Sequence, residues 1–289
     1  MDETIPIGVI GGSGLYRMKG LKAVREIAVT TPFGSPSDVL TVGEIEGIPV
    51  AFLPRHGRGH VHMPTEVPYR ANIYALKKLG VQKIISVSAC GSLREHLKPG
   101  HIVVPDQVFD FTKQRQNTFF GEGLVAHISI AEPYCAGLST VLADAVVQLE
   151  GTVHRGGSFI TIEGPRFSTK AESRVFRSWG MDIIGMTASP EIFLAREAGM
   201  CYATMAHITD YDVWHESEEP VTVEMVVRQL NANTALAQNV IRDLVPKLVE
   251  ADYKCECASA LATALITQRD RIPTETRDKL ALLIAPFLD

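Results

Sequence analysis

The stretch Tyr69-Arg-Ala-Asn-Ile-Tyr-Ala-Leu-Lys-Lys-Leu-Gly-Val-Gln-Lys-Ile-Ile-Ser-Val-Ser-Ala-Cys-Gly-Ser92 decides the fold class. Its first half places apolar residues at helical spacing and stops at Gly80, a residue suited to the position just past a helix. Its second half, 81–89, is apolar and β-branched, as buried strands are, and closes on the small residues 90–92. A helix that leads directly into a buried strand is typical of an α/β fold.

The same alternation extends in both directions along the chain. It predicts a single α/β domain over residues 1–250, with a central mixed, largely parallel sheet flanked by helices, and a helical C-terminal extension over 251–289. In such a sheet, ligands bind beyond the carboxyl ends of the strands. The predicted strands are 5–10, 39–42, 48–53, 81–89, 100–105, 152–163, 182–186 and 201–208. The predicted helices are 69–80, 132–151, 170–180, 190–199, 221–250, 258–267 and 274–285.

Composition excludes several classes of protein. Of the 289 residues, 46% are hydrophobic and 21% charged, which is typical of a folded globular chain. Acidic residues outnumber basic ones by 33 to 28, so no general positive charge attracts nucleic acid or an anionic membrane. The start of the chain lacks the basic and apolar regions of a secretory signal, and no apolar run reaches the length of a membrane span. We therefore expect a cytoplasmic protein that binds small molecules.

The chain has five cysteines, and we expect most of them to be free buried thiols. Only Cys255-Glu256-Cys257 is unusual, because such a pair can bind metal, form a strained disulfide or simply lie as two thiols on a helix. No second Cys or His pair follows, which disfavours zinc. The sequence predicts no metal site.

A glycine-rich turn, Gly11-Gly12-Ser13-Gly14, follows the first predicted strand. Backbone N–H groups in such a turn can bind an anion. The turn lacks the third glycine of a dinucleotide-binding motif, so a small anion such as phosphate fits it better, with Ser13 adding a hydroxyl. A merely tight strand-to-helix turn is an equally good interpretation.

A second cluster, residues 54–64, holds two arginines and three histidines. Its glycines and prolines exclude a stable helix. Arginine binds phosphate through paired N–H donors and histidine can add another, so Arg55 and His56 predict an oxyanion clamp. Metal binding by His56, His60 and His62, and a solvated basic loop, remain open as alternatives.

Further candidates lie at other predicted strand ends. Residues 88–92 are small enough to let backbone amides approach a ligand. Phe167 could stack on a base, and Thr187 precedes a helix N-terminus suited to phosphate, although both also fit as a core residue and a helix cap. Asp210 and Asp212 follow the strand 201–208 and could bind a cation, cap a helix or hydrogen-bond a heterocycle. Together the clusters predict one site for phosphate, a sugar and a purine.

Several of these motifs resemble signatures of the trimeric purine nucleoside phosphorylases, and in particular of the branch that cleaves 5′-methylthioadenosine. The resemblance covers residues 7–248 and rests on 11–15, 31–34, 55–57, 89–94, 163–167 and 209–212. It implies a phosphorylase/hydrolase-like fold and phosphorolysis of 5′-methylthioadenosine to adenine and 5-methylthioribose 1-phosphate. Phosphate is then a co-substrate and no cofactor is needed. Gly185 departs from the asparagine of the animal members, which bears on substrate contacts and not on the reaction.

The resemblance also implies a role for each matching residue. Phosphate would be bound by Ser13, Arg55, His56, Ser88, Ala89 and Thr187. The nucleoside would contact Met186, Phe167, Asp210, Asp212, Val223 and Val226, with His127 supplied by a neighbouring subunit of a homotrimer, alone or paired into a dimer of trimers. Asp210, His56 and Ser13 would take part in catalysis, with Asp210 hydrogen-bonding or protonating the purine N7.

The same residues bear on which substrate is preferred. An aspartate at 212 accepts from the 6-amino group of adenine, and an apolar lining at Val223 and Val226 favours a methylthio group over a hydroxyl. The alternatives are a phosphorylase for 6-oxopurine nucleosides or methylthioinosine, and a non-catalytic module that binds purine or phosphate. The cysteines 255 and 257 resemble a pair that is oxidised in some microbial members of the family.

Overall fold

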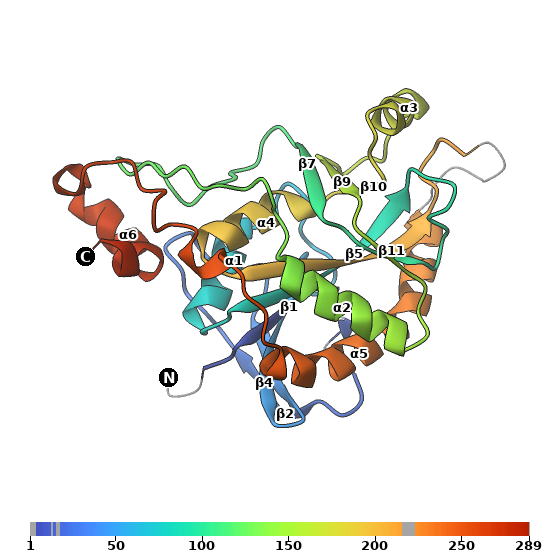
Figure 1. The fold of residues 1–289 in the computed structure, drawn as a ribbon, viewed down its shortest axis with the longest axis horizontal. Coiled ribbons are helices and arrows are strands. Elements are labelled where there is room, and N and C mark those ends of the chain that lie inside the picture. The colour runs from blue at the N-terminus through green and yellow to red at the C-terminus, as the bar shows by residue number, and fades with distance from the viewer. Residues whose placement is uncertain (1–3, 13, 16–17, 216–222, 289) are drawn as a thin grey trace.

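A computed structural model describes residues 4–12, 14–15, 18–215 and 223–288 of the chain, with only the backbone of helix residues 223 and 225–233 described (Figure 1). The strands are β1 (Ile7–Gly11), β2 (Lys22–Ile27), β3 (Leu40–Ile45), β4 (Ile48–Pro54), β5 (Lys83–Ser92), β6 (Ile102–Val104), β7 (Gln107–Phe111), β8 (Val153–Arg155), β9 (Ser158–Ile162), β10 (Ile183–Gly185) and β11 (Cys201–Asp210). The helices are α1 (Tyr69–Lys78), α2 (Ala136–Gln148), α3 (Lys170–Ser178), α4 (Ala188–Glu197), α5 (Val223–Glu250) and α6 (Thr274–Ile284).

The predicted mixed sheet is confirmed. One sheet contains all the strands of the described chain, with β2-β3-β4-β1-β5-β10-β9-β7 as one path; β11 branches from β5, β6 pairs with β11, and β8 pairs with β6. The pairs β1 with β4, β1 with β5, β5 with β11 and β9 with β10 are parallel, whereas β5 pairs antiparallel with β10. Strand β5 is therefore the centre of the sheet, with β1 and β11 along its length and β10 at its carboxyl end.

Apolar side chains alternate between the two faces of the sheet, because successive residues of a strand point in opposite directions. Ile10 and Ile84 pack in one cluster with residues of α1 and α4, while their neighbours Val9 and Ile85 pack in another with residues of α2 and α5. Figure 1 shows these two helix pairs on different sides of the strands. The continuous apolar runs of β1 and β5 thus reflect a sheet that is covered on both faces.

Most predicted elements form close to the expected residues, but four details were wrong. The predicted strand 152–163 is two strands, because Gly156 and Gly157 interrupt it with positive φ angles. Strands β2 and β7 were not predicted; β2 is mostly exposed and β7 half-buried, so neither has a clear apolar pattern. The segment 258–267 forms turns and a short 3₁₀ helix instead of the predicted α-helix.

The segment after α5 packs against the rest of the chain. Leu261, Leu280 and Ile284 lie in the same apolar cluster as Phe119 and Tyr134. In Figure 1, α6 projects from the body beside the green segment that contains residues 119–130. The extension predicted for 251–289 therefore adds to the core of the same domain.

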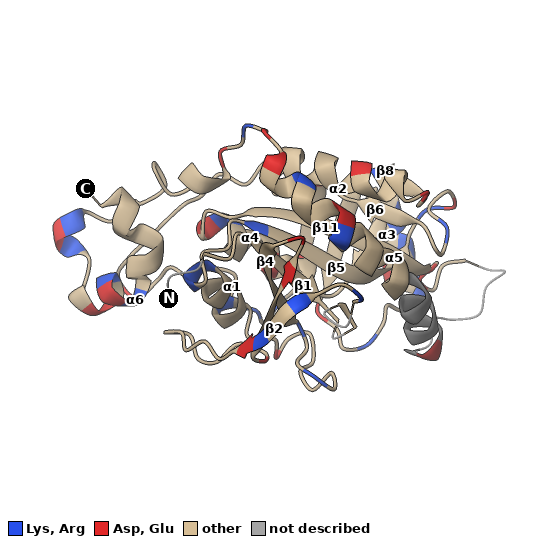
Figure 2. Ribbon diagram, turned by 90° about the horizontal axis from the view of Figure 1, so that it is seen from below, with Lys and Arg blue, Asp and Glu red and all other residues tan. Residues whose placement is uncertain are grey.

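No helix within the described residues is long and apolar enough to cross a membrane. In Figure 2, Lys and Arg lie interspersed with Asp and Glu along the ribbon, including the outer end of α6. In this view neither sign of charge dominates one face of the protein.

Candidate active site

The sheet brings most of the predicted site residues to one edge. Strand β1 ends at Gly11, opposite Pro54 at the end of β4, and the backbone N–H of Arg55 donates to Gly11 O at 3.0 Å. Next to β1, the end of β5 pairs with the end of β11, where Gly91 lies opposite Asp210. Four polar clusters that are far apart in sequence therefore meet because their strands end at the same edge.

Arg55 is buried and forms a two-point ion pair with Glu191 of α4. Its Nε donates to Oε2 at 2.8 Å and its Nη2 to Oε1 at 2.9 Å. The guanidinium also donates to Ser86 Oγ at 2.7 Å and to Val87 O at 3.0 Å, both on β5. Tyr202 Oη donates to Glu191 Oε1 at 2.7 Å and completes the network.

This network changes the interpretation of Arg55. The sequence predicted paired N–H donors that clamp phosphate, but four of the contacts of the guanidinium point inward to Glu191, Ser86 and Val87. Arginine has five N–H donors, so a single Nη1 hydrogen is left for an anion. The ion pair keeps the charge in place: Glu191 opposes the effect of burial, and the pKa of Arg55 is raised well above its usual value.

His56 follows Arg55 in a tight turn and is neutral at pH 7. Burial is the main reason that its pKa falls to about 4. Its Nδ1 lies 2.9 Å from His62 O, and because a carbonyl can only accept, Nδ1 carries the proton. The Nε2 atom is then an acceptor. His56 was expected to donate to phosphate, whereas this geometry prepares it to accept from a phosphate hydroxyl.

The remaining residues predicted for phosphate lie around the start of α4. Thr187 is the N-cap of this helix, yet its side chain makes no capping hydrogen bond, so its hydroxyl is available to an anion. The Ser189 N–H already donates to Thr161 Oγ1 at 3.2 Å and Pro190 has no N–H, so the start of α4 offers fewer donors to phosphate than the sequence predicted. Within the described residues, the buried Ser88 Oγ also has no hydrogen-bond partner. Ala89 is the next residue of β5 and is half-buried. Ser13 lies outside the described residues.

Asp210 and Asp212 form a buried carboxylate pair. Asp210 accepts from Thr209 Oγ1 at 2.6 Å and from the Asp212 backbone N–H at 2.8 Å. Burial nevertheless raises the pKa of Asp210. Burial also raises the pKa of Asp212 to about 6, an effect that the Ser173 hydroxyl opposes and the Asp210 carboxylate increases. Asp212 Oδ2 is buried and accepts no hydrogen bond of normal geometry from the described part of the chain.

The residues predicted to contact the sugar and base lie beside this pair. Met186 precedes Thr187 and is half-buried, with its sulfur close to Gly164. Phe167 is also half-buried. Both belong to segments that start where β10 and β9 end, and these two strands are paired in parallel. The backbone thus brings the two side chains to the same edge as Asp210.

Arg115 is a positioning residue that the sequence did not indicate. Its side chain is almost fully buried, and Nη1 donates to Met186 O at 2.6 Å and to Ser189 O at 2.7 Å. The same guanidinium donates to Glu163 O at 2.7 Å and Tyr69 Oη at 3.1 Å. Arg115 therefore joins the segments after β9 and β10. Arg115 lies in a loop, and the sequence alone does not distinguish it from a solvent-exposed arginine.

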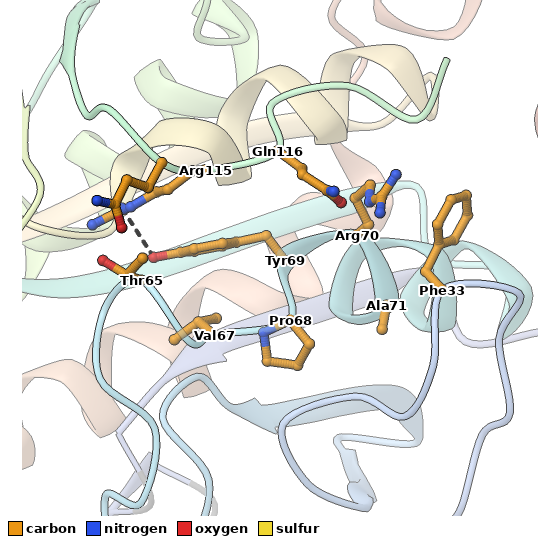
Figure 3. Close-up of a pocket in the computed structure, with 10 residues that line it drawn as sticks. Phe33, Thr65, Val67, Pro68, Tyr69, Arg70, Ala71, Arg115 and Gln116 are labelled. Atoms are coloured by element: carbon orange, nitrogen blue, oxygen red, sulfur yellow. Dashed lines mark hydrogen bonds between the residues drawn. The ribbon is translucent and has the colours of Figure 1, made fainter. Parts of the chain in front are cut away.

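A pocket of about 300 Å³ lies on the other side of Arg115 (Figure 3). Residues of three segments line it, namely Phe33, 65 and 67–71, and 114–116. Apart from Arg115 and its hydrogen bond to Tyr69, the pocket shares no residue with the site described above. It is a neighbouring hollow and contains none of the predicted site residues.

Three predicted site residues are not brought to this edge by the described chain. His127 is exposed, and its backbone N–H donates to Ala264 O at 2.9 Å in the segment beside α6. Figure 1 shows that segment extending away from the ends of β5 and β11. Val223 and Val226 lie on α5, where their side chains are outside the described part of the structure.

Comparison with known proteins defines the class of this protein. Residues 6–246 match the model of the Phosphorylase superfamily, so the chain belongs to that family. The resemblance seen in the sequence motifs is confirmed at this level.

The individual proteins that this chain matches, described next, are all named as methylthioadenosine phosphorylases. The chain is 54% identical to an S-methyl-5′-thioadenosine phosphorylase from Geobacter sulfurreducens over 283 residues, 98% of this chain and 99% of that protein. A methylthioadenosine phosphorylase from an antarctic soil metagenomic library superposes with a TM-score of 0.93 at 48% identity, covering 97% of this chain and 99% of that one. The methylthioadenosine phosphorylase of Schistosoma mansoni in complex with adenine gives a TM-score of 0.83 at 37% identity, with 98% of both chains covered.

Proposed function

We propose that this protein catalyses the reversible phosphorolysis of 5′-methylthioadenosine to adenine and 5-methylthioribose 1-phosphate. The observation that carries the proposal is the buried pair of Asp210 and Asp212, with raised pKa values, at the sheet edge that also holds Thr187 and Ser88. The names of the relatives support the same reaction. Such an enzyme recovers the purine and the sulfur-containing sugar, so it serves purine and methionine salvage.

At the phosphate end, the anion would be bound by the hydroxyls of Thr187 and Ser88 and by the remaining Arg55 hydrogen. His56 Nε2 would accept the hydrogen of a protonated phosphate oxygen. Another oxygen faces C1′ of the ribose. As the bond from C1′ to N9 breaks, positive charge grows on the ribose, and the bound anion stabilises that charge before bonding to C1′.

At the base end, the two electrons of the broken bond pass to the purine. Protonation or hydrogen bonding at N7 makes adenine a better leaving group, and Asp210 would supply that proton, which the rise in its pKa on burial supports. Asp212 Oδ2 is buried and has no hydrogen-bond partner of normal geometry among the described residues, and the exocyclic amine of adenine would satisfy it. A purine with an oxo group at this position offers no hydrogen to that oxygen.

A homotrimer with shared sites belongs to the same proposal. His127 would reach the 5′ end of the nucleoside only from a neighbouring subunit, because its own chain holds it beside α6. Val223 and Val226 would line the methylthio group and make a 5′-hydroxyl unfavourable to bury.

One assay tests the reaction. Purified protein is given 5′-methylthioadenosine, methylthioinosine, adenosine or inosine, with and without phosphate, and free base is measured. We expect release from 5′-methylthioadenosine to be fastest and to require phosphate. Release without phosphate indicates a hydrolase, no release indicates a binding module, and faster release from inosine indicates a 6-oxopurine enzyme; each result contradicts the proposal.

A matched pair of variants tests the role of Asp210. Because general acid catalysis contributes about 10²- to 10⁴-fold, we expect Asp210→Asn to lower kcat by a factor in that range. Asp144 is an exposed aspartate that pairs with Arg155, so Asp144→Asn serves as the control and should retain the activity of the unmodified protein. An Asp210→Asn variant with full kcat would refute the assignment.

A further inference from the structure

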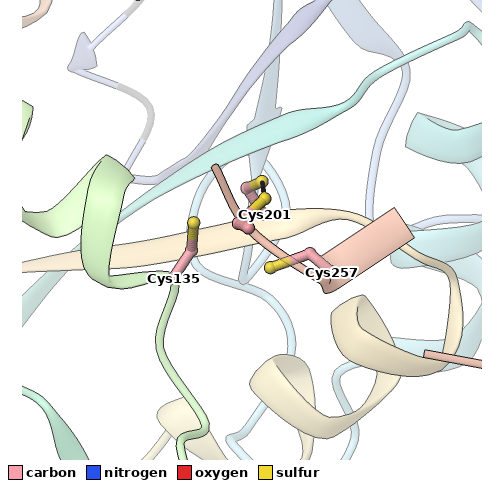
Figure 4. A group of neighbouring side chains, drawn as sticks. Cys135, Cys201 and Cys257 are labelled. Carbon is pink, nitrogen blue, oxygen red and sulfur yellow. Dashed lines mark hydrogen bonds between the residues drawn. The ribbon is translucent and has the colours of Figure 1, made fainter. Parts of the chain in front are cut away.

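Four of the five cysteines come together outside the active site (Figure 4). The sulfur atoms of Cys135, Cys201, Cys255 and Cys257 all lie within 4.8 Å of one another. Three of these residues are buried and Cys255 is exposed. The group does not include any residue that the proposed reaction uses, and the following inference does not depend on that reaction.

The cluster is assembled from three separate segments. Cys135 precedes α2 and its backbone N–H donates to Tyr202 O at 3.0 Å, which places it beside Cys201 at the start of β11. Cys255 and Cys257 follow α5, in a segment that crosses next to Gly137 of α2 and next to Gly199, just before β11. Figure 4 shows Cys135 and Cys257 with their sulfur atoms directed toward Cys201.

Two glycines make room for this crossing. A Cβ atom on Gly137 would lie 2.3 Å from the ring of Tyr253, so only glycine lets the segment before Cys255 pack on α2. Gly199 has a φ of +66°, and a Cβ there would lie 3.3 Å from Ala258 O and 3.6 Å from Cys257 O. The chain is thus locally built to bring the C-x-C pair against Cys135 and Cys201.

The distances fit a metal ion better than disulfides. Tetrahedral zinc with bonds of about 2.3 Å to sulfur separates its ligand atoms by about 3.8 Å. The separation of Cys201 and Cys255 is 3.4 Å, and the limit for all four sulfurs is 4.8 Å. A disulfide requires about 2.05 Å between its two sulfur atoms, so forming one would move two of the sulfurs away from their present positions.

We propose that Cys135, Cys201, Cys255 and Cys257 form a closed tetrathiolate site for a divalent metal ion, with zinc as the ion that the four-sulfur donor set prefers. Four protein ligands fill the tetrahedral coordination of zinc, so the site is structural and leaves no position for a substrate. Binding the ion displaces the remaining thiol protons. The expectation that the chain has no metal site rested on the absence of a second pair near Cys257 in sequence, and the fold supplies that pair from Cys135 and Cys201.

The test is metal analysis of the full-length protein, purified without reductant and without chelator. We expect about one zinc ion per chain, and all five thiols to react in denaturant that contains a chelator. One reactive thiol without zinc means two disulfides, and five reactive thiols without zinc mean an empty cluster; each result overturns the proposal. Iron in place of zinc overturns the assignment of the ion.

Variants locate the site. Cys255 is exposed, so Cys255→Ser should fold, as circular dichroism will verify, and it should lose its zinc to a chelator concentration that leaves the unmodified protein occupied. Cys255→His keeps a zinc ligand and should retain the ion. Cys90 is buried outside the cluster, so Cys90→Ala is the matched control for zinc content. Equal zinc retention by Cys255→Ser and the unmodified protein would refute the ligand set.

Cobalt provides a second readout that is independent of activity. When cobalt replaces zinc in a tetrahedral thiolate site, strong visible absorption and a charge-transfer band in the near ultraviolet appear. We expect both bands in the unmodified protein and their loss in Cys255→Ser. Spectra typical of octahedral cobalt would contradict the proposed site.

Discussion

Arg55 and Glu191 form a buried, two-point ion pair that joins the turn after β4 to helix α4. This pair holds the two halves of the proposed phosphate subsite together, because His56 follows Arg55 and Thr187 precedes the helix that carries Glu191. The neighbouring Tyr202 hydroxyl and the Ser86 hydroxyl fix the positions of both charged groups.

Removal of one partner from this pair should destabilise the protein strongly. An unpaired buried charge costs about 3–5 kcal/mol, so we expect Glu191→Ala to lower the free energy of unfolding by about that amount in urea titrations. Arg155 and Asp144 form an exposed pair, and Asp144→Ala should change the stability little. Equal effects of the two substitutions would show that the buried pair is not the source of the stability.

Asp212→Asn should make the protein more stable and less active. The pKa of Asp212 in the folded chain is about 6, above the 3.8 of a free aspartate, so the folded state holds an extra proton between those pH values. The free energy of unfolding therefore falls as pH rises from about 4 to about 6, because the charged form is buried at a cost. Asparagine removes this cost and tolerates the positive φ of 52° at this position.

We expect Asp212→Asn to raise the free energy of unfolding at pH 7 by about 1–3 kcal/mol and to flatten its dependence on pH below 6. Loss of the acceptor for the adenine amine should lower kcat/KM for 5′-methylthioadenosine by about tenfold to a hundredfold. Chemical denaturation at several pH values and steady-state assays measure the two effects. A less stable variant would contradict the assignment of a charged, unsatisfied Asp212 to the folded state.

His56 should discriminate between anions by accepting a proton that phosphate carries and sulfate lacks. The His56→Ala variant loses this hydrogen bond, so we expect its KM for phosphate to rise about tenfold. The preference for phosphate over sulfate as a competing anion should shrink in the same variant. His62 contributes its carbonyl, which His62→Ala retains, so this control should bind phosphate normally. An unchanged preference would show that His56 Nε2 does not accept from phosphate.

Shared sites in an oligomer can be tested by complementation. His127→Ala and Asp210→Asn variants, each of low activity, are coexpressed with different tags and the mixed oligomers are isolated. If His127 serves the neighbouring site, about a quarter of the sites in a random mixture combine an intact Asp210 with an intact His127, and activity returns. Mixed oligomers that stay as inactive as their parents would place both residues in the same subunit's site.

The parts of the structure that the sequence predicts are those with local patterns. The helix 69–80, the strand after it and the hairpin near Ile48 have clear periodicity and turn residues, and they form as expected. Strand ends with glycine or aspartate indicated the edge of the sheet where we propose that the substrate binds. The same local reasoning failed for residues 258–267, where the position against the core outweighs helical propensity.

Long-range pairings could not be predicted from one sequence. The local sequence around Glu191 does not distinguish it from a surface glutamate. Only the fold brings it to Arg55, 136 positions away. Cys135 and Cys201 likewise meet the later cysteines only in three dimensions. In each case the partner is set by which strands and helices pack together, and that information is not contained in the spacing of residues along the chain.

Strand β5 also sets the distance between the two ends of the proposed site. In the proposed site, Ser88 lies at the phosphate end, and Gly91 lies opposite Asp210 at the base end, three residues further along the same strand. At about 3.3 Å per residue, the strand spaces the two subsites about 10 Å apart. The rise per residue along β5 therefore sets the length of the substrate that fits between the two subsites. Deletion of one residue between Ser88 and Gly91 would shorten this distance by about 3.3 Å and turn the following side chains to the opposite face of the sheet.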